Sequence, residues 1–351
     1  MTPFVRRLAA PQPGWTIDAD VIVVGSGIAG LTAALELRAK VDRVLLVTKA
    51  ELGSGSTVWA QGGIAAALDP EDTPEEHLRD TLVAGAGLCS EEAVRALVTE
   101  GPDRVRELVA RGANFDTGPD GGITLTREGG HGRDRIAHAG GDATGAEISR
   151  ALIAQLAAGR NDPGIEVIEH AMVVDLLTAA PDADGRPGPV CGVTLHIIGE
   201  GTRDGVGAAL AKAVIMATGG IGQVFMSSTN PTSATGDGLA AALRAGAAIA
   251  DLEFVQFHPT AIDVAADPAP LATEALRGEG AVLINRAGER FMAKLHPDGE
   301  LAPRDVVAQG VFRERQAGRG AFLDCRAAIG AAFPDRFPTV YARCRDAGID
   351  P

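Results

Sequence analysis

The segment at residues 20–47 constrains the fold of this chain more than any other. An apolar run, DVIVV (20–24), is followed by GSGIAG (25–30), by apolar residues at helical spacing (31–40) and by a second apolar run, RVLLV (43–47). Continuous apolar runs of this length are typical of parallel strands that are buried on both faces. The pattern predicts a strand–helix–strand unit at the start of a Rossmann-like α/β domain.

Three glycines in the turn of this unit indicate a dinucleotide ligand. Gly25 permits a tight turn, Gly27 lets backbone approach a pyrophosphate, and Gly30 lets the helix pack close to the strand. Free N–H groups at the start of the helix would stabilise the negative charge of the phosphates. Lys49 stands where an acid usually binds the ribose, so both a cofactor contact and a solvated surface position stay open for it.

Composition excludes several classes of protein. The chain has 351 residues and a net charge of −14, and only 4% of its residues are aromatic, which argues against a nucleic-acid binder. No apolar run approaches the roughly 20 residues that cross a bilayer. The four cysteines are scattered without ligand or disulfide spacing, so we expect no metal site and a reducing, cytoplasmic location.

Other segments give weaker predictions of structure. We expect residues 1–18 to form a loose arm and residues 51–68 to form a loop that runs into a short helix. We expect one strand over residues 165–179 and, from about residue 252, a smaller α+β unit with a helix near residues 325–332. Helices are also expected over 73–87, 90–112, 142–158, 236–247 and 303–317, with Thr73 and Ser90 as N-caps of the first two.

Several polar residues have a plain structural alternative when each is taken alone. The small residues of GSTVWAQGG (55–63) suit a close approach to a flavin or pyrophosphate, but they also suit an ordinary loop. Asp237 could contact a cofactor or simply cap a helix. Glu128, His258 and Arg304 are by default structural or solvated residues, and together they suit a dicarboxylate ligand.

A longer series of motifs carries a resemblance to a known family. The motifs include VIVVGSGIAGLTAALEL, GSTVWAQGGIAAAL, LTREGGHGRDRIAHAGGDATG, TNPTSATGDGLAAALRAGAAIADLEFVQFHPTA, LATEALRGEG and GELAPRDVVAQG, in family order between residues 19 and 311. On these motifs the chain resembles the fumarate reductase/succinate dehydrogenase flavoprotein family, and within it the branch that oxidises L-aspartate. The resemblance implies a Rossmann-like three-layer FAD-binding domain with a smaller α+β capping domain that closes over the flavin.

The resemblance also implies how FAD is held. Ser56 stands near the position where covalently flavinylated relatives carry a histidine, so noncovalent FAD is expected, with Lys49 in place of the ribose acid. The expected FAD contacts are Gly25, Ser26, Gly27, Ile28, Ala29, Gly30, Lys49, Ser56, Thr57, Val58, Trp59, Ala60, Gln61, Gly62, Gly63, Met172, Val173 and Asp237.

For the substrate, the resemblance implies a site lined by His258, Thr273, Glu274 and Arg304, with Arg304 matching the family's proton donor or acceptor. Glu128 would face the substrate amino group, which favours an amino acid over a plain dicarboxylate because an ammonium group needs an anion nearby. Arg304, His258 and Glu128 are the expected catalytic residues. A guanidinium is effectively always protonated, so we expect Arg304 to stabilise charge more than to exchange protons.

The implied reaction is the oxidation of L-aspartate to iminoaspartate, the first step of de novo NAD biosynthesis. O2, which would give H2O2, or fumarate would accept the electrons, and quinolinate synthase would be the downstream enzyme. The alternatives are a fumarate reductase or succinate dehydrogenase flavoprotein, a non-catalytic FAD-binding module and, less well supported, an NAD-linked dehydrogenase.

The expected domains are an arm at 1–14, an FAD-binding domain at 15–251 that lacks its last portion, and a capping domain at 252–351. Family members continue well beyond the equivalent of residue 351 with further substrate and FAD residues. We therefore expect these 351 residues alone to be weakly active or inactive.

Overall fold

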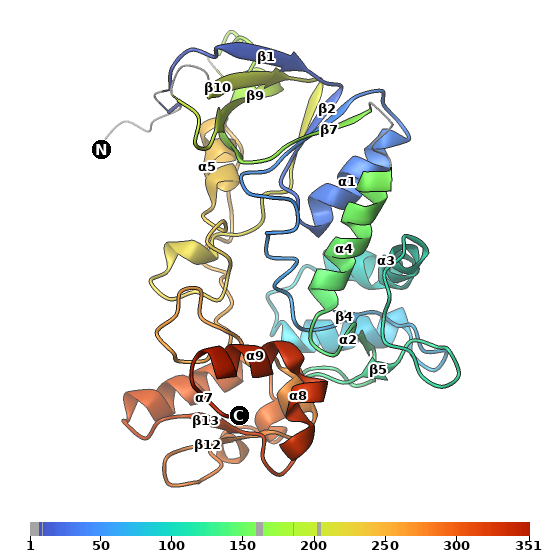
Figure 1. Ribbon diagram of the computed structural model, residues 1–351, viewed down its shortest axis with the longest axis vertical. Helices are drawn as coiled ribbons and strands as arrows, with labels where there is room; N and C mark the ends of the chain where they lie inside the picture. Colours follow the sequence, from blue (N-terminus) through green and yellow to red (C-terminus); the bar gives the residue numbers. More distant parts are fainter. Residues whose placement is uncertain (1–6, 9, 159–163, 185, 202–204) are drawn as a thin grey trace. The chain divides into compact units, whose positions relative to one another are not determined.

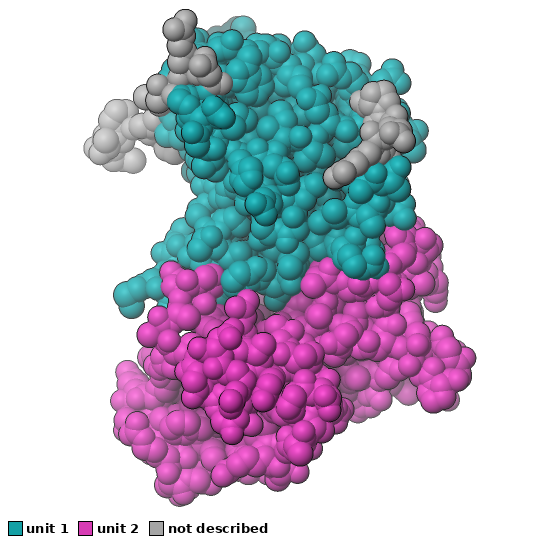
Figure 2. Space-filling view, in the orientation of Figure 1, with its two compact units in different colours: residues 1–59, 148–255 teal, residues 60–147, 256–351 magenta. Residues whose placement is uncertain are grey.

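The chain divides into two compact units (Figure 2). The computed structural model describes residues 7–8, 10–158, 164–184, 186–201 and 205–351. Unit 1 contains residues 1–59 and 148–255, and unit 2 contains residues 60–147 and 256–351. Residues 60–147 thus form one compact unit together with the C-terminal segment. The expected boundary between the FAD-binding domain and the capping domain lay at 251/252. This boundary stays a prediction.

A four-stranded parallel sheet forms the first layer of unit 1 (Figure 1). Its strand order is β11-β2-β3-β7, with β2 at Val21–Val24, β3 at Val44–Val47, β7 at Ile165–Ile168 and β11 at Ala213–Met216. All residues of β2 and β3 are buried, as the apolar runs predicted. Helix α1 (Ile28–Arg38) connects these two strands and packs on them, which confirms the predicted strand–helix–strand unit.

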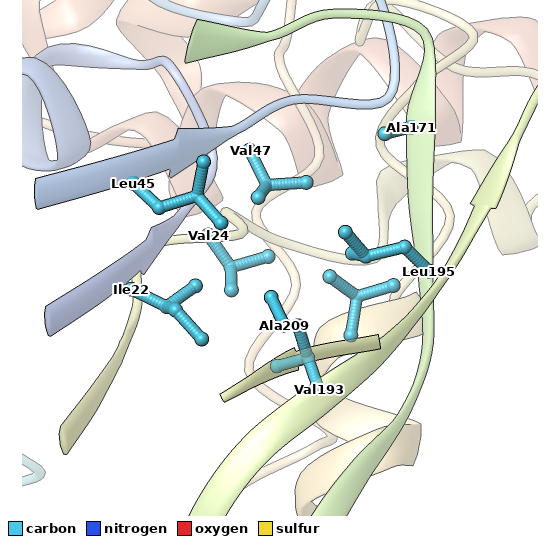
Figure 3. Close-up of a cluster of buried hydrophobic side chains, with 9 residues drawn as sticks. Ile22, Val24, Leu45, Val47, Ala171, Val193, Leu195 and Ala209 are labelled. Atoms are coloured by element: carbon cyan, nitrogen blue, oxygen red, sulfur yellow. The ribbon is translucent and has the colours of Figure 1, made fainter. Parts of the chain in front are cut away.

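A second four-stranded sheet packs against the first. Its order is β1-β10-β9-β8, with β1 at Trp15–Asp18, β8 at Ala171–Thr178, β9 at Val190–Ile197 and β10 at Val206–Leu210. Side chains from both sheets meet in one apolar core, in which Ile22 and Leu45 lie opposite Val193 and Leu195 (Figure 3). Helix α5 (Asp237–Arg244) packs on β8. The helix α1 and the two sheets make up the predicted three-layer α/β fold.

Two predictions in unit 1 need correction. Residues 15–18 are not part of a loose arm but form β1, because their backbone pairs in parallel with β10. Residues 1–6 and 9 of the expected arm lie outside the described residues. The strand expected over 165–179 is two strands in different sheets, and the chain turns between them at His170, whose φ is +53°.

Unit 2 contains helices packed around two small sheets. Its helices are α2 (Pro74–Ala84), α3 (Glu91–Ala110), α6 (Ala275–Gly278), α7 (Arg304–Gln316), α8 (Phe333–Arg336) and α9 (Pro338–Asp346). Strands β4 (Ile64–Ala65), β5 (Leu125–Thr126) and β6 (Ile136–Ala137) form a three-stranded antiparallel sheet, and β12 (Val282–Ile284) pairs with β13 (Phe322–Asp324). Thr73 and Ser90 cap α2 and α3 as predicted. Helix α4 (Thr144–Ala158) runs across the boundary at 147/148.

Two further predictions are wrong in detail. The loop at 51–68 does not end in a short helix but in β4, because Ile64 and Ala65 pair with β6. The helix expected near 325–332 is a turn followed by one 3-10 turn at Gly330–Ala332, and α8 begins only at Phe333. No helix in the described residues is both long enough and apolar enough to cross a membrane.

Candidate active site

The glycine turn of unit 1 has the geometry that its sequence predicted. Gly25 has a φ of +108°, and a side chain there would come within 2.3 Å of the Ala217 carbonyl oxygen. A side chain at Gly30 would lie 1.8 Å from the Gly25 oxygen. At Gly27, by contrast, the nearest atom to an added Cβ is the Thr57 hydroxyl at 3.3 Å. Packing therefore requires Gly25 and Gly30, while Gly27 leaves room for a ligand at the start of α1.

Three other segments gather at the same edge of the parallel sheet, and two of them, at Thr57 and at the start of α5, contain predicted cofactor residues. The ATGG segment (217–220) follows β11 and borders Gly25. A side chain at Gly238 would lie 2.1 Å from the Thr218 hydroxyl, so the start of α5 packs on this segment as well. The Thr57 hydroxyl accepts a hydrogen bond from the Ile28 amide at 2.9 Å. This edge lies at the carboxyl ends of parallel strands, where doubly wound folds bind nucleotides, and the residues present fit a dinucleotide.

Lys49 and Asp237 make an ion pair with each other. The Lys49 ammonium also donates to the Thr235 hydroxyl at 2.6 Å, and that hydroxyl donates to the Asp237 carboxylate at 2.8 Å. Lys49 is therefore not the solvated surface charge of its plain alternative. Asp237 does not cap a helix either, because the N-cap of α5 is Gly236 and Asp237 is the first residue of the helix. Their direct contacts with FAD stay predictions.

Residues 56–63 lie in two environments. Ser56, Thr57, Val58 and Trp59 belong to unit 1, whereas Ala60, Gln61, Gly62 and Gly63 belong to unit 2. A side chain at Gly63 would lie 2.4 Å from the Ile136 side chain, so this glycine packs directly on β6. The buried Gln61 side-chain oxygen has no hydrogen-bond partner among the described residues, which leaves one acceptor for a ligand.

The remaining predicted cofactor residues occupy regular positions. Ser26 is buried and its hydroxyl donates to the Thr48 hydroxyl at 2.8 Å. Ala29 lies in the first turn of α1. Met172 and Val173 lie in β8, where they pair with β9. Their contacts with FAD stay predictions.

In unit 2, Arg304 brings together residues far apart in the sequence. It is the first residue of α7, directly after Pro303, and its side chain is 35% exposed. Its guanidinium is paired with Glu274 and lies 3.3 Å from the Gln256 side-chain oxygen and 3.4 Å from Glu128 Oε2. One planar cation with several directed donors thus stands among two carboxylates and an amide, which suits the binding of a carboxylate ligand.

Glu128 is buried and has one oxygen without a partner. The side chain is 9% exposed, and among the described residues no group makes a hydrogen bond to Oε1. Burial, and then the negative charge of Glu274, raise the pKa of Glu128, while Arg304, Arg277 and the Gly63 amide oppose this rise. A side chain at Gly62 would lie 3.7 Å from Glu128 Oε1, so this glycine of the predicted flavin loop borders that oxygen.

Glu274 is a partner of Arg304 and of a second buried arginine. It is 3% exposed, its Oε1 accepts from the Gly129 amide at 3.2 Å, and Arg277 lies 3.5 Å away. Burial lowers the pKa of Arg277, whose Nε and Nη2 make no hydrogen bond with the described residues. The direct substrate contact predicted for Glu274 stays a prediction.

His258 is held as a neutral imidazole. Burial, followed by the charges of Arg304 and Arg277, lowers the pKa of His258 to about 3. Its Nδ1 accepts a hydrogen bond from the Thr260 amide at 3.2 Å, so the ring proton resides on Nε2. The side chain is thus a hydrogen-bond donor and not a cation. Thr273 is buried, with its hydroxyl 3.4 Å from the Ala275 amide.

Sequence reasoning did not single out Gln256, Arg277, Arg135 or His138. Gln256 stands two residues before His258, and Arg277 follows Glu274 by three residues on α6, so both lie inside motifs that were recognised. His138 lies 2.9 Å from the Thr126 hydroxyl and 3.9 Å from Glu128 Oε1. His138 and Arg135 also lie inside a recognised motif, the one that contains Glu128, but nothing in their spacing indicates which groups they contact.

Comparisons with known proteins agree with this geometry. A family model described as FAD binding domain matches residues 20–351. The L-aspartate oxidase of Streptomyces coelicolor is 58% identical over 100% of this chain and 60% of its own length, and that of Caulobacter vibrioides is 52% identical over 94% and 62%. A solved quinol fumarate reductase from E. coli superposes with a TM-score of 0.83 at 31% identity, over 94% of this chain and 57% of that one.

These similarities confirm the resemblance drawn from the motifs, including its closer match to the aspartate-oxidising branch. The chain spans about 60% of the length of the curated relatives it matches.

Proposed function

We propose that this member of the FAD-binding-domain family, whose cofactor is FAD, carries the cofactor site and the substrate clamp of an enzyme that oxidises L-aspartate to iminoaspartate. The substrate clamp is the group of side chains Glu128, His258, Thr273, Glu274 and Arg304. The observation that carries this proposal is the buried Glu128 carboxylate with its free Oε1 beside Arg304. A buried carboxylate without a cationic partner on that oxygen is costly, and a substrate ammonium group would supply the partner.

The side chains of unit 2 account for recognition of a dicarboxylate. Arg304 offers a planar set of donors to one carboxylate, and neutral His258 donates from Nε2 without adding charge. Thr273 adds a hydroxyl. Together these groups bind and orient the substrate, and fixing its Cα–H bond is a major part of the catalytic effect.

Oxidation of an amine to an imine removes a hydride from Cα and a proton from nitrogen. FAD, when bound, supplies the hydride acceptor. Glu128 holds the ammonium group and can take its proton on Oε1, because its raised pKa makes it a stronger base than an exposed carboxylate. Arg304, held by Glu274, stabilises the substrate carboxylate throughout.

The wider role follows from the same proposal. O2, which gives H2O2, or fumarate accepts the electrons, and iminoaspartate passes to quinolinate synthase in the first steps of de novo NAD biosynthesis. The protein acts in the cytoplasm with noncovalent FAD. The 351 residues alone are expected to bind FAD but to turn over weakly or not at all.

The test uses two proteins: residues 1–351, and the same residues joined to the remaining part of the Streptomyces coelicolor relative. Both are loaded with FAD and assayed for H2O2 formation with L-aspartate or succinate. The proposal requires aspartate-dependent peroxide from the longer protein, and bound flavin that acid precipitation releases. A longer protein that is reduced by succinate but not by aspartate would refute it.

The second candidate is a fumarate reductase or succinate dehydrogenase flavoprotein, favoured by the structural similarity to quinol fumarate reductase. Glu128→Gln separates the two candidates, because it should impair aspartate oxidation and spare a reaction of succinate or fumarate. Bound flavin without turnover of any dicarboxylate would instead favour a non-catalytic FAD-binding module.

A further inference from the structure

A fully buried arginine outside the substrate clamp holds the loop that carries Glu128. Arg135 lies just before β6, and its side chain is 0% exposed. Its Nε and Nη2 donate to the two oxygens of Asp72, each at 2.8 Å, in a bidentate pair. The remaining guanidinium nitrogen, Nη1, donates to Asp80 at 2.6 Å. Asp72 lies just before α2 and Asp80 lies within it, so Arg135 joins this helix to the β5–β6 hairpin.

Asp80 passes this restraint to the loop itself. The carboxylate oxygen that pairs with Arg135 also accepts a hydrogen bond from the Gly132 amide at 2.7 Å. Burial raises the pKa of Asp80, but the Gly132 amide and Arg135 outweigh burial and hold this pKa below its usual value, so Asp80 is a carboxylate. The loop is therefore tied down four residues after Glu128.

The other side of the loop is held at the substrate clamp. The Gly129 amide, next to Glu128, donates to Glu274 at 3.2 Å. A side chain at Gly129 would come within 2.9 Å of the Leu301 carbonyl oxygen, so the backbone of Gly129 packs closely on the segment that precedes α7. Glu128 thus sits between two anchors, one at Glu274 and one at Asp80, and only the second depends on Arg135.

We infer that Arg135 is a positioning residue, which acts through Asp80 and Gly132 to hold the free oxygen of Glu128 where it meets a substrate amino group. This inference rests on the proposed function and extends it to specificity. A loosened loop loses binding of the ammonium group and leaves the carboxylate contacts of Arg304 and His258 in place. The effect is confined to substrates with an amino group.

The experiment compares Asp80→Asn with the unchanged sequence in the FAD-loaded, extended protein described above. Asparagine keeps the shape of aspartate but loses the ion pair with Arg135. We expect the KM for L-aspartate to rise about tenfold, since the charge-assisted hydrogen bond to the ammonium group is weakened but not removed. The dissociation constant of succinate, measured from its perturbation of the flavin spectrum, should change less than about twofold.

Asp134→Asn is the matched control. Asp134 lies in the same loop, but it is exposed, and its ion-pair partner among the described residues is exposed Arg127 at 2.8 Å. Its removal should leave both constants unchanged. Arg135→Lys is the second variant, because one ammonium group cannot reproduce the bidentate pair with Asp72 and the bond to Asp80 together. It should also raise the KM for L-aspartate and spare succinate.

A double-mutant cycle tests the route of the effect. In a Glu128→Gln background, Asp80→Asn should raise the KM for L-aspartate no further, because both changes remove the same contact. Additive effects, an unchanged KM in Asp80→Asn, or equal weakening of succinate would each overturn the inference. If the unchanged protein does not oxidise L-aspartate, the proposed function is refuted together with this inference. If the unchanged protein oxidises L-aspartate but the variants do not alter its KM, only the positioning role of Arg135 is refuted.

Discussion

Burial of Glu128 provides a carboxylate that can bind an ammonium group and also raises the pKa of that carboxylate. Its side chain is 9% exposed and faces Arg304 with one oxygen, while the other oxygen has no hydrogen-bond partner in the part of the chain that the structure describes. Removing its negative charge would remove a charge-assisted hydrogen bond to the substrate, which is typically worth about 1.5–3 kcal/mol. We therefore expect Glu128→Gln to raise the KM for L-aspartate by roughly 10- to 100-fold, measured by steady-state peroxide formation.

The pH dependence of substrate binding provides a separate prediction at the residue scale. Only the ionised form of Glu128 attracts an ammonium group, and burial raises the pKa of Glu128. The KM for L-aspartate should therefore rise as pH falls through that pKa, while the dissociation constant of succinate should not follow it. Glu128→Gln should abolish this difference. A difference that survives the substitution would show that another group titrates.

At the scale of elements, the turn between β2 and α1 separates two functions of glycine. Gly30→Ala would place a methyl group 1.8 Å from the Gly25 oxygen, and it should destabilise the apoprotein by several kcal/mol because backbone must move. Gly27→Ala meets only the Thr57 hydroxyl at 3.3 Å and should cost no more than about 1 kcal/mol. Thermal unfolding of the apoproteins measures both effects.

FAD affinity should show the opposite ranking: at a temperature where both variants are folded, Gly27→Ala should weaken FAD binding more than Gly30→Ala does. Gly27→Ala should weaken FAD binding at least about tenfold, because its methyl group occupies the space that a pyrophosphate approaches. Titration of flavin fluorescence against apoprotein gives this constant. Unchanged FAD affinity in Gly27→Ala would place the pyrophosphate elsewhere.

At the scale of the whole chain, unit 2 consists of two segments separated by more than a hundred residues. Asp142, which is 1% exposed, connects them by accepting hydrogen bonds from the Thr339 and Val340 amides at the start of α9. Asp142→Ala leaves these amides without a cap and should destabilise unit 2 by about 1–2 kcal/mol. Hydrogen exchange should quicken over α9 and not over β2.

Asp346→Ala is the control for this change. Asp346 is exposed at the other end of the same helix, where a negative charge gives no stabilisation. Exchange over α9 should be unchanged or slightly slower in this variant. Equal exchange rates in Asp142→Ala and the unchanged protein would contradict the role given to Asp142.

Acid unfolding should report on a buried histidine. Burial, followed by the charge of Arg135, lowers the pKa of His77 to about 4, and its Nδ1 has no partner among the described residues. The unfolded imidazole titrates near 6.5, so between about pH 6.5 and 4 the unfolded state binds a proton that the folded state does not. As pH falls through this range, protonation of the unfolded His77 should therefore lower the free energy of unfolding by up to about 1.4 kcal/mol per pH unit.

His77→Phe should remove that contribution. The ring still packs beside His131, whose centroid lies 5.7 Å from that of His77, but it cannot be protonated. Relative to the unchanged protein, the variant should gain stability progressively as pH falls from 6.5 to 4, as followed by denaturant unfolding at each pH. A constant difference across this range would show that His77 does not titrate there.

What could be predicted from the sequence depends on the range of the interactions involved. The tight turn at Gly25, the close packing at Gly30, the apolar runs of β2 and β3, and the caps Thr73 and Ser90 depend on interactions within a few residues or with directly adjacent backbone, and these predictions are confirmed. The pyrophosphate contact of Gly27 stays a prediction. Strand β1 is missed because its four residues alternate in burial and form a strand only through pairing with β10.

The sequence by itself thus determined which glycine, glutamate, histidine and arginine residues are the candidates, and the order of their motifs indicated the family. The sequence did not determine which residues these side chains contact. Lys49 with Asp237, Arg304 with Glu128, and Arg135 with Asp72 are separated by 188, 176 and 63 residues. A charge far along the chain becomes a partner only when folding removes water from between the two groups, and that exclusion of water exists only in the tertiary structure.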